Sequence, residues 1–137
     1  MWPPDVESYY RSLAIRRGWS PETVASFWRA VEYYRELDES ASARLYFAGV
    51  DDEGWKWFFE VVEHDDELIA VKQIETPPGE RAHRYWWQHL DDDDGFLTDQ
   101  PLGREEIAIG RFRAVTAEEF RIVWDEADER GKERRVL

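Results

Sequence analysis

The stretch of sequence that decides the fold runs from residue 44 to residue 90 and reads RLYFAGV-DDEG-WKWFFEVVE-HDDE-LIAVKQIET-PPGE-RAHRYWWQHL. Four of its segments alternate apolar and polar residues with a period of two. Clusters of Asp, Glu, Pro and Gly separate them, which is typical of strands joined by turns. We predict strands at 44–50, 55–63, 68–76 and 81–90. Connections of four to six residues are too short for a parallel crossover, so we expect an antiparallel meander.

Helical periodicity precedes this stretch. Residues 5–17 carry an apolar stripe, acidic residues in the first turn and basic residues in the last, and Gly18 is typical of a helix end. Ser20 then fits an N-cap with Pro21 at the first helical position, and a second apolar stripe continues to about Leu37. Because the connection between the two helices is so short, we predict that they fold back as a helical hairpin.

The sequence after residue 90 predicts a loop, a strand and a helix. Residues 91–104 form a long acidic loop, a short strand falls within 105–114, and Thr116 with Glu119 fits a capping box that starts a helix ending near Gly131. The predicted fold class is α+β, with an N-terminal helical hairpin, an antiparallel meander of four to five strands and a C-terminal helix. We expect a single domain over 1–137, comprising the hairpin (1–42), the acidic meander (43–114) and the last helix (115–131).

Composition supports one folded domain with a strongly acidic middle. The 137 residues are 42% apolar and 15% aromatic, and their net charge is −13. Residues 43–110 hold seventeen acidic and six basic residues, whereas residues 1–42 hold seven acidic and five basic, and residues 111–137 hold seven of each. Such a charge repels phosphate backbones and anionic lipids, so we expect no nucleic-acid or membrane partner. A basic protein partner is favoured instead.

The chain has neither a leader-like N-terminus nor a long apolar segment, so we expect a cytoplasmic protein. It contains no Cys, which excludes disulfides and thiolate chemistry. His83 and His89 lie six residues apart on a predicted strand, roughly 20 Å, too far to bind one metal ion. Asp91–Asp94 and Gly95 fail the EF-hand spacing, and no nucleotide-binding or serine-hydrolase motif occurs. We therefore expect no catalytic residue, metal or cofactor.

The strand pattern predicts two different sheet faces. Trp57 and Phe59 share the expected core face with the helices, while Phe58 lies on the second face. Trp86 and Trp87 are adjacent and should point to opposite sides, Trp87 into the core and Trp86 onto the second face. If all three helices cover one face, the second is an exposed contact surface. The alternative is that a curved sheet or the acidic loop covers these rings.

The end of the chain carries a family resemblance. Ile107, Phe112 and Thr116 are followed by Glu118-Glu119-Phe120 and Val123-Trp124. This arrangement resembles the ending of a family of small, uncharacterised, acidic bacterial proteins in which a hairpin-rich segment precedes a short strand and a helix. Some of them look like immunity or accessory proteins of bacterial conflict systems. The resemblance covers about residues 43–127 and implies no catalytic residue, since the family has no assigned activity.

These observations favour a non-enzymatic acidic protein that binds a basic protein partner, as an immunity protein or inhibitor would. The predicted partner-binding residues are Phe58, Arg84, Trp86, Asp91, Asp92, Asp93 and Asp94. The alternative is a small-ligand or carbohydrate-binding module in which sheet aromatics line a pocket. A structural or dimerisation role and an enzyme are the remaining classes, and a homo-oligomer stays open.

Overall fold

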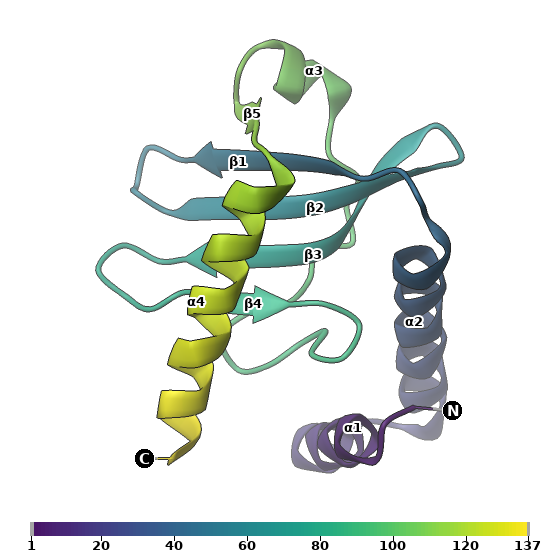
Figure 1. Cartoon of the computed structure of the whole chain (residues 1–137). Helices are drawn as coiled ribbons and strands as arrows, with labels where there is room; N and C mark the ends of the chain where they lie inside the picture. Colours follow the sequence, from purple (N-terminus) through teal and green to yellow (C-terminus); the bar gives the residue numbers. More distant parts are fainter. Residues whose placement is uncertain (1, 137) are drawn as a thin grey trace.

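A computed structural model of the chain describes residues 2–136, with side chains through residue 127. Over this range it has the predicted α+β architecture (Figure 1). The helices are α1 (Pro4–Arg17), α2 (Pro21–Ser40), α3 (Arg104–Ala108) and α4 (Ala117–Val136). The strands are β1 (Leu45–Val50), β2 (Lys56–His64), β3 (Glu67–Thr76), β4 (His83–Tyr85) and β5 (Phe112–Ala114). They form one antiparallel sheet in the order β4-β3-β2-β1-β5, so the predicted meander is confirmed.

Local capping explains the helical hairpin. Gly18 ends α1 in the left-handed conformation (φ 63°), and its N–H donates to the carbonyl groups of Ala14 and Ile15. The Ser20 side chain accepts a hydrogen bond from the Thr23 N–H at 3.2 Å and starts α2. Both signals were visible in the sequence, and the structure confirms the predicted hairpin.

The prediction of a strand at 81–90 is wrong for residues 86–90. β4 ends at Tyr85, and the chain turns back at once because Trp86 and His89 exchange backbone hydrogen bonds of 2.9 and 3.3 Å. Trp86 and Trp87 therefore lie in the turn after the strand and not within the strand itself. The short strand predicted within 105–114 is confirmed as β5, and the short helix α3, which the sequence did not predict, precedes it.

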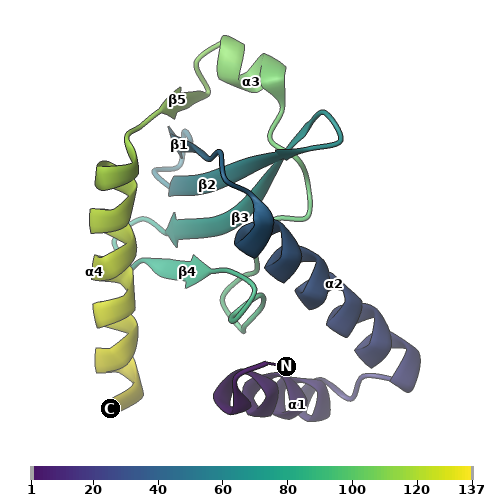
Figure 2. The same ribbon diagram turned by 45° about the vertical axis from the view of Figure 1, so that its right-hand side comes forward.

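The helices lie on both faces of the sheet, not on one as predicted. The hairpin of α1 and α2 covers one face, and α4 crosses the strands on the other (Figures 1 and 2). Phe120 and Ala127 of α4 are buried against Ile74, and Phe58 packs into the same cluster. The reason is that both sheet faces carry apolar side chains, so α4 buries its own apolar stripe where the hairpin is not.

A group of four charged side chains joins the end of α2 to the sheet. Arg44 pairs with Asp38 at 2.6 Å and with Glu60 at 2.5 Å, and Lys72 contacts the same two carboxylates at 3.3 and 3.0 Å. Glu60 is buried and Asp38 is nearly buried. Arg44 and Lys72 neutralise both carboxylates, because burying an unpaired charge would strongly destabilise the fold.

No helix within the described residues has the length and apolar character needed to cross a membrane.

Candidate functional site

The structure separates the predicted partner-binding residues into two groups. Phe58, Arg84 and Trp86 lie on the sheet face that α4 covers. Asp91–Asp94 lie beside the C-terminal end of α1, where Arg16 and Arg17 are located. A single contact surface that contains all seven residues is therefore not formed.

The first group is a half-buried cluster beside α4. The Arg84 guanidinium lies 4.5 Å from the centre of the Trp124 ring and 5.8 Å from that of Trp86, and the two indoles meet edge to face at 5.7 Å. Phe58 is half-buried against α4. The expectation that this face is an exposed patch is therefore wrong. Trp87, in contrast, is 6% exposed and packs in the cluster beneath the helical hairpin, as predicted.

Asp92 organises the acidic loop. Its carboxylate accepts hydrogen bonds from the N–H groups of Asp94 and Gly95 and from the Tyr85 hydroxyl, and it lies 2.9 Å from His89 Nε2. Burial alone would raise the pKa of this carboxyl group. The hydrogen bonds from His89, the Asp94 N–H and Tyr85 outweigh burial and lower the pKa from 3.8 to about 2. Asp92 is therefore a structural anion.

The neighbouring carboxylates fasten the loop to α1. Asp91 pairs with Arg17 at 3.1 Å, and Asp93 contacts Arg16 at 3.3 Å. The Tyr9 hydroxyl donates to the Asp91 carbonyl group at 2.7 Å. Asp91 and Asp92 are thus engaged within the chain, whereas Asp93 and Asp94 stay exposed to solvent. The pair Arg16-Arg17 was the sequence signal for this contact between the loop and α1. Sequence reasoning interpreted the pair only as basic residues that mark the end of a helix.

A second acidic segment, which sequence reasoning treated only as a polar turn, lies at the β2–β3 hairpin. We define the acidic tip as Glu63, Asp65, Asp66 and Glu67, all of which are exposed. Asp65 and Asp66 both have positive φ angles, 51° and 65°, as a two-residue hairpin turn requires. Within residues 2–127, Arg104 lies 3.4 Å from Glu63 and His64 Nε2 lies 3.4 Å from the Asp65 carboxylate, while neither Asp66 nor Glu67 has an ion-pair partner.

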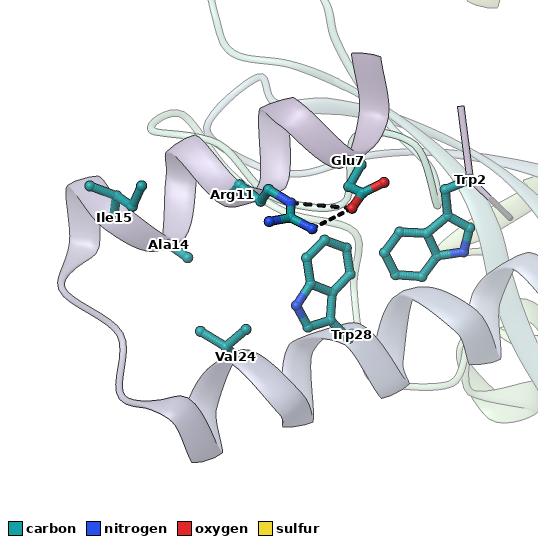
Figure 3. Close-up of a pocket in the computed structure, with 7 residues that line it drawn as sticks. All are labelled: Trp2, Glu7, Arg11, Ala14, Ile15, Val24 and Trp28. Atoms are coloured by element: carbon teal, nitrogen blue, oxygen red, sulfur yellow. Dashed lines mark hydrogen bonds and ion pairs between the residues drawn. The ribbon is translucent and has the colours of Figure 1, made fainter. Parts of the chain in front are cut away.

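A groove runs between α1 and α2 on the side away from the sheet (Figure 3). Its volume is about 620 Å³, and it is lined by Trp2, Glu7, Arg11, Ala14, Ile15, Val24 and Trp28. Trp2 and Trp28 stack with ring centres 4.4 Å apart at one end, and the Trp2 indole N–H donates to Glu32 at 2.7 Å. Glu7 and Arg11 pair at 2.5 Å on its rim.

This groove differs from the pocket that the ligand-binding alternative predicts. The ligand-binding alternative requires sheet aromatics in a pocket, whereas this lining comes from the two helices and from Trp2, which precedes them. Sequence reasoning did not select Trp2, since it precedes the first helical stripe. Among the described side chains, no group of three or more His and acidic residues is arranged to hold a metal ion.

Comparison of the chain with protein-family models, curated proteins and solved structures gives no significant match. The resemblance of residues 43–127 to small acidic bacterial proteins therefore stays a prediction.

Proposed function

We propose that the protein is a non-enzymatic binding protein whose acidic tip engages a basic protein partner. The proposal rests on the concentration of charge in residues 43–110 and on where the structure leaves that charge accessible. Carboxylates concentrated on one surface attract a cationic partner over distances comparable to the Debye length and speed its association. Fast and salt-sensitive binding is the physical expectation.

The observation that carries the proposal is the pair Asp65-Asp66. Two-residue hairpin turns with positive φ at both positions favour Asn-Gly or Asp-Gly, because glycine adopts this conformation without steric cost. The chain has a carboxylate at both positions and further carboxylates at Glu63 and Glu67. Four like charges at a strained turn do not favour folding, so their presence supports a role in recognition.

The acidic tip is a better candidate than Asp91–Asp94 because fewer groups of the chain itself contact its carboxylates. Asp91 and Asp92 have guanidinium, imidazole, hydroxyl and backbone N–H groups around them, and binding a basic protein would have to compete with these contacts. At the acidic tip, Arg104 contacts Glu63 and the His64 imidazole lies beside Asp65, while Asp66 and Glu67 have no ion-pair partner among the described side chains. An immunity-like or inhibitor-like role, as the family resemblance implies, would use such a surface.

The test uses a fluorescent deca-lysine peptide and the full chain. The tip variant is Asp65→Asn with Asp66→Asn, since Asn tolerates positive φ and removes the charge alone. The control, Asp52→Asn with Glu53→Gln, removes two exposed charges from the β1–β2 turn. We expect the tip variant to bind roughly fivefold more weakly than the control in fluorescence anisotropy at low salt. Equal affinities would show that net charge alone attracts the peptide, and would overturn the proposed site.

A further inference from the structure

We propose that the groove between α1 and α2 is the surface through which two copies of this chain associate. This inference is independent of the proposed partner at the acidic tip. Figure 2 shows α2 running from the sheet down to the α1–α2 turn, which lies far from the β2–β3 hairpin. A second copy on the groove would therefore leave the acidic tip accessible.

The shape of the groove is the first argument. Val6, Tyr10 and Leu13 bury one face of α1 in the core, and the groove is lined by the half-buried Ala14 beside that face and by the exposed Ile15. Ile15 is 80% exposed at the margin, beside a hollow whose walls are the small side chains of Ala14 and Val24. A protruding apolar side chain and a hollow on one surface are self-complementary, as a two-fold symmetric interface requires.

The distribution of charge is the second argument, and it selects a second copy over other occupants. Two molecules of net charge −13 repel each other, so they can meet only where the surface is close to neutral. Residues 1–42 hold five basic and seven acidic residues, whereas residues 43–110 hold six and seventeen. A basic partner would be drawn to the second region and not to the hairpin.

The ion pair on the rim supplies complementarity between copies. Glu7 and Arg11 are one helical turn apart, and both remain exposed to solvent. Across a two-fold axis, Arg11 of one copy would face the partner's Glu7, and the reverse contact would form by symmetry. The charged rim would then specify the orientation in which the apolar residues meet.

The first experiment measures the oligomeric state of the full chain by sedimentation velocity over a hundredfold range of concentration. The test variant is Ile15→Asp, and the matched control is Ile122→Asp, because Ile122 is also exposed, at 55%, but lies on α4. We expect the unmodified chain and the control to dimerise with concentration and Ile15→Asp to remain monomeric with an unchanged circular dichroism spectrum. A chain that stays monomeric over the whole range, or equal effects of both variants, would overturn the inference.

A charge exchange tests the orientation. Arg11→Glu should weaken the dimer, since two carboxylates then face each other, and Glu7→Arg with Arg11→Glu should restore it. Salt separates this interface from the proposed function. We expect added NaCl to weaken deca-lysine binding and to leave dimerisation equal or stronger, because screening reduces the repulsion between like-charged copies. Failure of the double variant to restore the dimer, or a dimer that salt dissociates, would contradict the proposed contacts.

Discussion

Asp66 occupies a backbone conformation that glycine adopts more easily. Its φ is 65° and its side chain is exposed, so the residue contributes charge at the turn and little packing. We predict that Asp66→Gly raises the free energy of unfolding by about 1 kcal/mol in urea denaturation, because the strain of a left-handed non-glycine residue is removed. Asp66→Asn separates this effect from the loss of charge. A lower stability for Asp66→Gly would show that the carboxylate is held by contacts the turn geometry does not reveal.

The pKa of Asp92 gives a second residue-scale prediction, since the pKa is lowered to about 2 in the folded protein and is 3.8 for the ordinary group. The carboxylate therefore stabilises the fold at pH values above 3.8, and this contribution is lost as the pH falls toward 2. We expect Asp92→Asn to cost about 2 kcal/mol at pH 7 and the difference from the unmodified chain to shrink between pH 4 and pH 2. A constant difference, measured by urea denaturation at each pH, would exclude this ionisation as the cause.

At the scale of elements, α4 holds the second sheet face through a narrow apolar stripe. Phe120 is 3% exposed and stacks with Trp124, whereas Ile122 on the same helix is 55% exposed. We predict that Phe120→Ala costs about 3 to 5 kcal/mol and Ile122→Ala less than about 0.5 kcal/mol in urea unfolding. Similar costs would mean that α4 packs differently on the sheet.

The sequence predicted those elements that are stabilised by contacts between residues close together in the chain. Gly18 and Ser20 act within a few residues of themselves, so the helical hairpin could be predicted from their spacing. The turn after Tyr85 could not, because the Tyr10 hydroxyl of α1 donates to the Trp87 carbonyl group and accepts from the Leu90 N–H at 3.0 Å. These partners are 77 and 80 residues apart in sequence, and alternation of apolar residues carries no information about such contacts.

The candidate surfaces show the same limit. The alternation in β2 correctly separated Phe58 from Phe59, but it could not indicate which face the distant helix α4 would cover. The composition identified an acidic middle segment, but tertiary contacts such as Arg17 with Asp91 and Tyr85 with Asp92 are needed to distinguish its engaged carboxylates from the exposed ones at the acidic tip.

At the scale of the whole molecule, the net charge of −13 opposes folding, because the compact state brings like charges together. The ion pairs of the acidic loop and of the Arg44 cluster act over less than 4 Å and are partly buried, so salt screens them less than it screens repulsion across the surface. We therefore predict that the melting temperature rises as NaCl increases from about 0.02 M to about 0.5 M, where the Debye length falls to a few ångströms. Asp65→Asn with Asp66→Asn should melt higher at low salt and gain less from NaCl, since part of the repulsion is already removed. A melting temperature that falls with NaCl would show instead that attraction within the ion pairs exceeds the repulsion among the remaining acidic residues.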